Sequence, residues 1–221
     1  MRDRNAPLTE ADIVSLAWEK MDGLIPAVVQ DAATLQLLML GYMDEAALRA
    51  TLASGRATFF SRSKERLWEK GETSGNHLAV QRILADCDGD SLLVEADPAG
   101  PTCHLGTPSC FSEQGADGVG WLAALRRIVA GRAAADPATS YTARLLGAGP
   151  ERIAQKIGEE GVELALAAVA RDRDGCVEEA ADLIYHLTVL MEARGFGWDD
   201  IVAVLRRRHE GADPSGAEPR N

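Results

Sequence analysis

The spacing of the apolar residues changes near residue 120, and this change constrains the fold more than any other feature of the 221-residue sequence. Before that point, short apolar runs are separated by turn residues, a pattern typical of β-strands. After it, the apolar residues follow the three- to four-residue spacing of amphipathic helices. The sequence therefore predicts an α+β chain with a β-rich N-terminal domain followed by an all-α helical bundle.

The first half of the sequence is predicted to fold mainly into strands. Strands are expected over residues 23–30, 34–43, 56–63, 78–88 and 91–97. A short helical segment is expected after Thr9, and a longer helix between Asp44 as its N-cap and Gly55 as its stop. The last two strands are separated by Asp88-Gly89-Asp90, a sequence that favours the tight turn of a β-hairpin.

The second half is predicted to be helical throughout. Helices are expected over residues 121–132, 151–172, 176–195 and 198–210. The polar, glycine-rich stretch SEQGADGVG between the two halves is typical of a linker. The predicted organisation is a first domain over 1–111, a linker over 112–120, a helical domain over 121–210 and a disordered tail over 211–221.

The net charge of −11 argues against a surface that binds nucleic acid or an anionic membrane. The apolar runs are too short to cross a bilayer, and the charged N-terminus differs from a secretion signal. We therefore expect a cytoplasmic protein whose four cysteines are thiols or metal ligands rather than disulfides. Residues 56–82 depart from the acidic trend with six basic and three acidic side chains, which suits a small anionic ligand.

Within this basic segment, the stretch FFSRSKERLWEKGETSGN is a candidate phosphate-binding loop. Guanidinium and backbone N–H groups are the donors that a phosphate requires. The candidate substrate-binding residues are Arg62, Lys64, Lys70, Ser74, Gly75 and Asn76. The alternative is a charged hairpin without a ligand.

The stretch ADCDGD places three carboxylates and a thiol in the predicted hairpin turn. Asp86, Asp88 and Asp90 are hard oxygen ligands of the kind that suits Mg²⁺. In a hairpin, Asp86 and Asp88 share one face of a strand end, Asp90 can return across the turn, and Cys87 points to the opposite face. The alternative is an acidic turn that is simply solvated.

Three cysteines of the first half form a second candidate metal set. Cys103 and Cys110 lie in CHLGTPSC, a loop rich in glycine, proline, serine and threonine, and Cys87 precedes them. Three thiolates without a fourth protein ligand match a catalytic zinc, which keeps one position for water. The spacing alone also permits three ordinary small apolar residues. The H-x-E and P-C-x-x-C motifs that together identify zinc deaminases are absent from the sequence.

Two of the predicted helices carry paired carboxylates beside their apolar stripes. Glu160 and Glu163 share one helix face, and so do Glu179 and Asp182. Carboxylates facing a bundle interior are costly unless cations neutralise them, so these helices are candidates for a Mg²⁺ cage. The candidate ligands are Glu159, Glu160, Glu163, Glu179 and Asp182. Lys156, one turn before Glu160, adds positive charge on the same face, and solvated helix faces are the alternative.

These motifs resemble those of two enzyme families. The stretches FFSRSKERLWEKGETSGN, DCDGD and CHLGTPSCF resemble phosphoribosyl-AMP cyclohydrolase. The stretches SYTARLL, KIGEEGVELALAA and EAADLIYH resemble phosphoribosyl-ATP pyrophosphatase. Their order resembles the fused bifunctional family of histidine biosynthesis over nearly the whole chain, with the first residues as an N-terminal extension outside the resemblance.

The resemblance implies two consecutive hydrolytic steps. The helical domain would cleave phosphoribosyl-ATP to phosphoribosyl-AMP and pyrophosphate, and the β-rich domain would then open the adenine ring at N1–C6. The resemblance implies zinc on Cys87, Cys103 and Cys110, in a homodimer whose subunits share each zinc site. It also implies Mg²⁺ on the three aspartates of ADCDGD and on the helical carboxylates.

The resemblance also suggests which residues act in catalysis. His104, next to a ligand cysteine, is the candidate for proton transfer near the zinc. A glutamate, Glu160 or Glu163, would activate the attacking water, and Lys156 would stabilise charge on the phosphates. Two alternatives remain: a general nucleotide pyrophosphatase with a non-catalytic, metal-binding first domain, and a zinc- and nucleotide-binding regulatory module without turnover.

Overall fold

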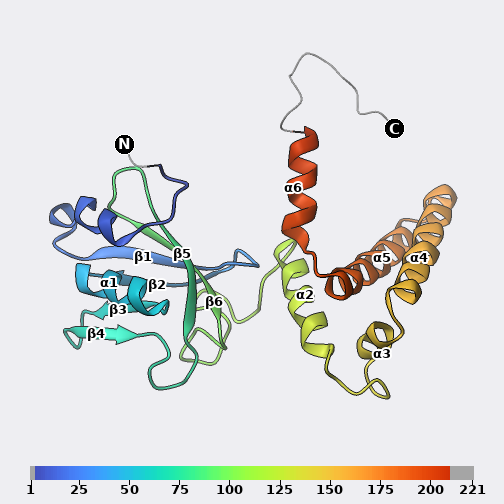
Figure 1. The fold of residues 1–221 in the computed structure, drawn as a ribbon, viewed down its shortest axis with the longest axis horizontal. Helices are drawn as coiled ribbons and strands as arrows, with labels where there is room; N and C mark the ends of the chain where they lie inside the picture. Colours follow the sequence, from blue (N-terminus) through green and yellow to red (C-terminus); the bar gives the residue numbers. More distant parts are fainter. Residues whose placement is uncertain (1–2, 210–221) are drawn as a thin grey trace, which may run out of the picture. The chain divides into compact units, whose positions relative to one another are not determined.

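A computed structural model of the chain describes residues 3–209, and Figure 1 shows their path. The chain divides into two compact units, of which one ends at Trp121 and the other begins at Leu122. In the described residues all strands lie in the first unit, and the second contains only helices and their connections. The predicted α+β architecture is therefore confirmed. The predicted tail over residues 211–221 lies outside the described residues.

The first unit contains a four-stranded sheet in the order β2-β1-β6-β5. Its strands are β1 (Ile25–Asp31), β2 (Leu37–Met43), β5 (Leu78–Ala85) and β6 (Leu92–Pro98). β1 pairs antiparallel with β2 and parallel with β6, and β6 pairs antiparallel with β5. The β5–β6 pair is the predicted hairpin, so its turn presents the aspartates of ADCDGD at one end of the sheet.

Alternating apolar residues bury one face of this sheet. In β1 the side chains of Ile25, Ala27 and Val29 are fully buried, whereas the residues between them are only partly buried. This period of two is what a strand with one packed face requires. β6 follows the same rule with Leu92 and Val94, so the hairpin register is fixed by burial as well as by its turn.

α1 (Glu45–Ser54) begins and ends where the sequence predicted. The Asp44 carboxylate accepts the backbone N–H of Ala47, which is an N-cap bond. Gly55 ends the helix at a φ of 71°, a left-handed conformation that glycine adopts without a Cβ clash. Both signals act within one helical turn, so the sequence alone located the two ends.

A small two-stranded sheet, β3 (Thr58–Ser61) and β4 (Arg66–Glu69), carries the basic segment. Phe59 of β3 is buried in the main core. It packs so closely on Gly41 of β2 that a Cβ at Gly41 would lie 2.4 Å from the Phe59 ring. The sequence did not predict β4, because four residues with charged ends show no clear alternation. The core contact of Phe59 anchors the hairpin that precedes the GETSGN loop.

The N-terminal segment is part of the first core. Leu8, Ile13 and Leu16 are buried with the sheet residues, and the Leu8 N–H donates to the carbonyl oxygen of Ile83 at 2.7 Å. The predicted helical start after Thr9 is confirmed: the segment forms two short 3₁₀ helices, η1 (Glu10–Ser15), which Thr9 caps, and η2 (Glu19–Met21). An extension outside the family motifs thus supplies core residues of its own.

The second unit is built from five helices in the described residues. They are α2 (Gly120–Arg132), α3 (Tyr141–Gly147), α4 (Pro150–Ala170), α5 (Arg173–Arg194) and α6 (Trp198–His209). A two-residue turn joins α4 to α5, which lie side by side as an antiparallel pair (Figure 1). A small core holds Val129, Leu145, Ile153 and Val189. The sequence did not predict α3, because seven residues are too few to show helical periodicity.

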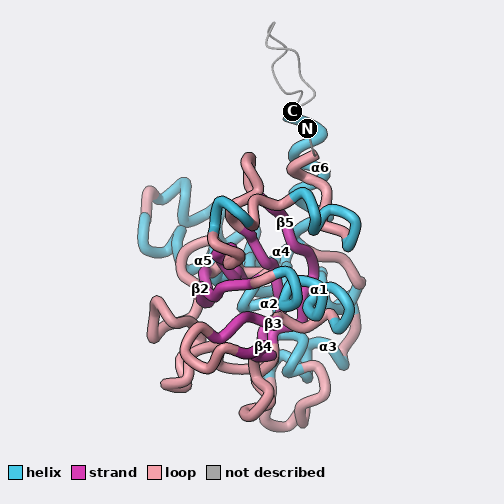
Figure 2. The backbone as a smooth tube through the Cα atoms, turned by 90° about the vertical axis from the view of Figure 1, so that its left-hand side faces the viewer, coloured by secondary structure: helices cyan, strands magenta, loops and turns pink. Residues whose placement is uncertain are grey.

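The segment over residues 99–119 contains turns and bends but no helix or strand. Figure 2 distinguishes such loops from helices and strands by colour. The CHLGTPSC motif lies here. The Cys110 N–H donates to the carbonyl oxygen of Leu38 at 2.8 Å, and the Ser109 hydroxyl donates to that of Leu37 at 2.7 Å. These bonds attach the cysteine loop to β2, so an irregular segment has a defined position in the first unit.

Candidate metal and nucleotide sites

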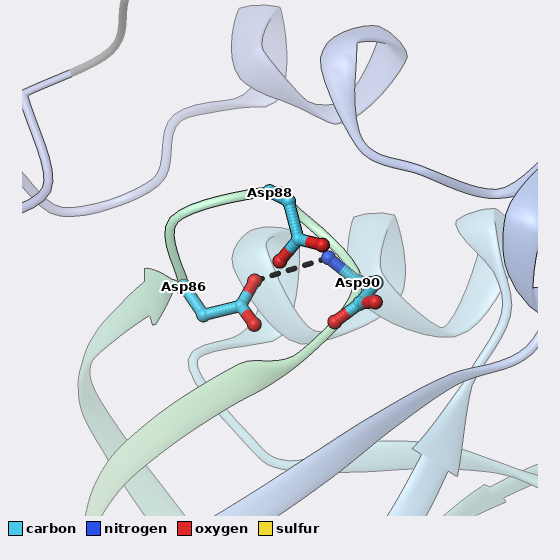
Figure 3. Close-up of side chains that lie close together, drawn as sticks. All are labelled: Asp86, Asp88 and Asp90. Atoms are coloured by element: carbon cyan, nitrogen blue, oxygen red, sulfur yellow. Dashed lines mark hydrogen bonds between the residues drawn. The ribbon is translucent and has the colours of Figure 1, made fainter.

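The three aspartates of ADCDGD converge in the β5–β6 turn. Carboxylate oxygens of Asp86, Asp88 and Asp90 lie within 4.8 Å of one another, and Figure 3 shows the side chains gathered around the turn. The Asp86 carboxylate accepts the backbone N–H groups of Asp90 at 3.0 Å and Ser91 at 3.2 Å. Asp86 thus orders the turn, while the other two carboxylates are directed to other partners.

Lys20 is the partner that the sequence did not reveal. Its ammonium donates to Asp88 at 2.6 Å and also to Asp90. These bonds lower the pKa of both carboxylates and raise the pKa of Lys20. Lys20 and Asp88 are more than half exposed and Asp90 is partly exposed, so the contribution of these bonds to stability is small. The bonds nevertheless show that the triad already attracts a cation, which a divalent ion would have to displace or share.

Cys87 does not point away from the aspartates as predicted. β5 ends at Ala85, so the alternation of strand side chains stops before the turn and no longer dictates where Cys87 points. Its Sγ lies 3.8 Å from Oδ1 of Asp88. The thiol is exposed. In residues 3–209, no group of three metal-binding side chains with ligand atoms within 4.8 Å includes a cysteine.

Cys103 and Cys110, in contrast, lie together. Each of the two thiols contributes to the pKa shift of the other. The backbone N–H of Leu105 and then the Thr107 hydroxyl lower the pKa of Cys103. Partial burial and then the charge of Cys103 raise the pKa of Cys110. Cys103 is therefore the thiol of this pair that ionises first, and the thiolate is the form that binds a metal.

A cavity of about 330 Å³ joins this cysteine loop to the basic loop. Lys70, Ser74 and Asn76 line it from one side, and Cys103 and His104 from the other. Lys70 is buried, which lowers the pKa of its ammonium, and the charges of the two thiols partly oppose this shift. The cavity therefore combines a positive charge, hydroxyl and amide groups, an imidazole and the thiol of Cys103, a set of groups that suits an anionic nucleotide.

The remaining residues of the predicted phosphate loop lie elsewhere. The Arg62 guanidinium stacks 4.0 Å from the centre of the Tyr42 ring. Lys64 is exposed, and neither it nor Gly75 lines the cavity. Gly71, which the sequence did not single out, has a φ of 87°, and a Cβ there would lie 2.5 Å from the Asn76 backbone. The loop closes on itself at this glycine and so presents Ser74 and Asn76 to the cavity.

In the second unit, three carboxylates from two helices converge. Glu160 of α4 and Glu179 and Asp182 of α5 have oxygens within 4.8 Å of one another. Glu160 is only 4% exposed, and the Lys156 ammonium lies 2.7 Å from its Oε1. Burial and then the negative charges of Glu163, Glu160 and Asp182 raise the pKa of Glu179. A cluster with one ammonium and this many carboxylates fits a further cation.

Two of the five predicted cage residues are placed differently. Glu159 turns to Lys156 at 2.9 Å and to the Gln155 amide at 2.9 Å. These contacts lower the pKa of Glu159, with Lys156 as the largest cause. Glu163 is exposed and outside the converging group, but its charge still acts on Glu179. Glu163 is thus the carboxylate at the open side of the cluster.

His186 and Tyr141 also belong to this cluster, although no role was predicted for them. Nδ1 of His186 lies 2.9 Å from the carbonyl oxygen of Asp182 and 3.7 Å from Oε1 of Glu160. Its Nε2 lies 3.1 Å from the Tyr141 hydroxyl. The sequence contained a signal for His186, because it follows Asp182 by four residues and therefore lies on the same helix face. No local spacing relates Tyr141 to His186, because they are 45 residues apart.

The raised pKa of Glu179 predicts how metal-free stability depends on pH. The folded chain retains this proton at a pH where the unfolded chain, with an ordinary pKa near 4.5, has lost it. Stability therefore falls as pH rises from that value through the raised pKa, and it stays reduced above it. In EDTA at neutral pH, we expect Glu179→Gln to raise the melting temperature by roughly a few degrees.

The check is a thermal melt of both proteins across pH. The gain from Glu179→Gln should vanish at about pH 4, where wild-type Glu179 is protonated in both states. Glu178→Gln is the matched control, since Glu178 is the exposed neighbour outside the cluster. An equal gain at pH 4 and at neutral pH would contradict the assignment of the charge repulsion to Glu179.

The two sites define a class of protein: a two-domain chain with a carboxylate cluster on a helix pair and a separate cavity lined by lysine, thiol and imidazole groups. The sequence matches the family model of phosphoribosyl-AMP cyclohydrolase over residues 39–112 and that of phosphoribosyl-ATP pyrophosphohydrolase over residues 122–209. The chain belongs to the bifunctional family of histidine biosynthesis that joins these two hydrolase domains.

Several relatives named histidine biosynthesis bifunctional protein HisIE match along their whole length. The protein of Escherichia coli strain K12 is 54% identical over 203 residues, which cover 92% of this chain and 100% of the relative. The relative from Yersinia pestis is 51% identical with 92% and 99% covered, and that from Photobacterium profundum is 52% identical with 89% and 98% covered. Among the described helices, none has the length and apolar character needed to cross a membrane.

Proposed function

We propose that the two activities take place at separate metal sites. In the helical domain, phosphoribosyl-ATP is hydrolysed to phosphoribosyl-AMP and pyrophosphate with Mg²⁺. In the β-rich domain, water is added to the adenine ring of phosphoribosyl-AMP, and the ring opens at N1–C6, with Zn²⁺ and Mg²⁺. The observation that carries most of this proposal is the convergence of Glu160, Glu179 and Asp182 from two helices beside Lys156.

In the helical domain, we assign metal binding to Glu160, Glu179 and Asp182. When bound, Mg²⁺ offsets the charge of the phosphates and of these carboxylates. Lys156, fixed by Glu159 and Glu160, adds positive charge beside the phosphates. Glu163 stands at the open side of the cluster, where a carboxylate is suited to orient or deprotonate the attacking water.

In the β-rich domain, the cavity beside the cysteine loop is assigned to phosphoribosyl-AMP. Lys70, Ser74 and Asn76 offer an ammonium and neutral donors to a phosphate. The lowered pKa of Cys103 and the nearby thiol of Cys110 fit a metal ion such as zinc. When bound, zinc lowers the pKa of its water to about 7. Nδ1 of His104 lies 3.8 Å from the Cys103 sulfur, a position suited to proton transfer at this site.

A second pair of assignments concerns the aspartates and the dimer. Asp86, Asp88 and Asp90 are assigned to Mg²⁺, because their oxygens converge and already attract the ammonium of Lys20. Cys87 is apart from the other two thiols within one chain. We assign it to the zinc site of a partner subunit in a homodimer, which would complete a three-thiolate set.

We also propose bounds for the two domains and a cellular compartment for the protein. A linker over residues 112–120 between domains at 1–111 and 121–210 is supported by the gap between the two family matches. Cytoplasmic location is supported by the need of the proposed zinc site for reduced thiols.

The test supplies phosphoribosyl-ATP with Mg²⁺ and Zn²⁺ and follows two products. Pyrophosphate release and the ultraviolet change of ring opening should both occur, and phosphoribosyl-AMP supplied alone should give only ring opening. Pyrophosphate release without ring opening, together with cleavage of ordinary nucleoside triphosphates, would instead indicate a general nucleotide pyrophosphatase. The absence of both products in a folded, metal-loaded chain would refute the proposal.

A further inference from the structure

His186 is a buried, ionisable residue of the helical domain that has no part in the mechanism above. It is 4% exposed, and both of its ring nitrogens are bonded. The carbonyl oxygen of Asp182 can only accept, so in a neutral imidazole the proton lies on Nδ1. Nε2 is then an acceptor, and the Tyr141 hydroxyl donates to it. The proton of the phenol is therefore directed inward, and its oxygen can only accept from any other partner.

Tyr141 remains accessible although its hydroxyl is held in this way. It is 45% exposed, although its hydroxyl is bonded to a buried side chain. The Arg144 guanidinium lies over the Tyr141 ring, 5.6 Å from its centre. The Tyr185 ring stacks with the Tyr141 ring, with the two ring centres 6.2 Å apart. An exposed aromatic ring beside a guanidinium is a surface on which nucleobases stack.

Tyr141 stands at one end of the carboxylate cluster. Glu179, Asp182 and His186 follow one another at three- and four-residue intervals along one face of α5. Seven residues of helix span about 10 Å, which is comparable with the length of a triphosphate. Phosphates held near Glu179 and Asp182 therefore leave the rest of the nucleotide within reach of Tyr141.

We propose that Tyr141 and Arg144 receive the nucleoside end of the substrate, and that His186 is a positioning residue that fixes the Tyr141 ring for this contact. The inference rests on the proposed function of the helical domain as a nucleotide pyrophosphohydrolase. It adds the part of that site that distinguishes a nucleotide from a simple polyphosphate. The carboxylates recognise the phosphates through a metal, and the aromatic end recognises the base and ribose.

The test compares two ligands that share the phosphates and differ in the nucleoside. Binding of ATP and of inorganic tripolyphosphate to the full chain with Mg²⁺ is measured by calorimetry, and the heat that remains in Glu160→Gln is subtracted. Tyr141→Leu should weaken ATP binding by about tenfold or more, as expected for the loss of one aromatic contact with a base. It should leave tripolyphosphate binding unchanged. Tyr141→Trp, which keeps an aromatic surface, should retain most of the ATP affinity.

Variants of His186 test its positioning role. His186→Gln keeps an acceptor for the Tyr141 hydroxyl and should restore much of the ATP affinity that His186→Leu loses. In turnover, Tyr141→Leu should raise KM for phosphoribosyl-ATP much more than it lowers kcat. Equal weakening of both ligands, or unchanged ATP binding in Tyr141→Leu, would overturn the inference. Since calorimetry needs no turnover, a chain that binds ATP through Tyr141 but releases no pyrophosphate would contradict only the proposed function.

Discussion

Replacing Cys103 by alanine is expected to abolish ring opening while pyrophosphate release continues. Cys103 has the lowered pKa of the thiol pair, so its loss removes the proposed zinc ligand that ionises most readily. We expect ring opening to fall by about 10³-fold or more, because a metal lowers the pKa of bound water from about 16 to about 7. Pyrophosphate release should stay within about twofold, since the proposed sites lie in separate units and share no residue.

The measurement follows both products and the zinc content of the purified chain. Cys176→Ala is the matched control, because Cys176 is a free thiol of the helical unit with no proposed ligand role. It should leave both rates and the zinc content unchanged. If Cys103→Ala lowered both rates in a chain that melts like the wild type, the assignment of two separate sites would be wrong.

Replacing Glu160 by glutamine is expected to have the opposite effect. Glu160 is the buried carboxylate of the cluster, and both Lys156 and His186 approach its Oε1. Glutamine keeps the shape and can accept from Lys156, but it removes the charge that a metal requires. Pyrophosphate release should fall at least about 100-fold, since even residues that only orient metal ligands cost up to that factor.

Ring opening of supplied phosphoribosyl-AMP should be unaffected in Glu160→Gln. Glu178→Gln controls for charge removal on the same helix pair and should release pyrophosphate normally. Direct Mn²⁺ binding separates a lost metal ligand from a damaged fold, because only the former lowers affinity at an unchanged melting temperature. Normal Mn²⁺ affinity in Glu160→Gln would remove Glu160 from the proposed cage.

The helical carboxylates show how far local spacing can predict a site. Glu160 with Glu163, and Glu179 with Asp182, were expected on shared faces because three residues make nearly one helical turn. The structure adds that Glu160 faces inward, whereas Glu163 stays exposed. Burial depends on which side of α4 meets α5. No property of α4 alone determines which of its faces is buried. The relative importance of the five predicted cage carboxylates therefore could not be read from the sequence.

The turn of ADCDGD shows where strand periodicity stops being informative. The hairpin was predicted correctly from Asp88-Gly89-Asp90, and Gly89 has the positive φ, 75°, that such a turn favours. The direction of Cys87 was predicted wrongly because alternation requires ladder hydrogen bonds, and β5 ends at Ala85. Beyond that residue, side-chain directions follow the turn geometry and the bonds of Asp86.

The sequence by itself determined the two-part architecture, the ends of α1, the β5–β6 hairpin and the types of residue available for metal binding. All of these depend on interactions within a few residues, which spacing and caps express directly. Only the tertiary structure placed Lys20 on aspartates 68 and 70 residues away, Lys70 in one cavity with Cys103, and Tyr141 on His186. Such contacts arise when separate elements pack together, and packing depends on the whole core rather than on any one segment.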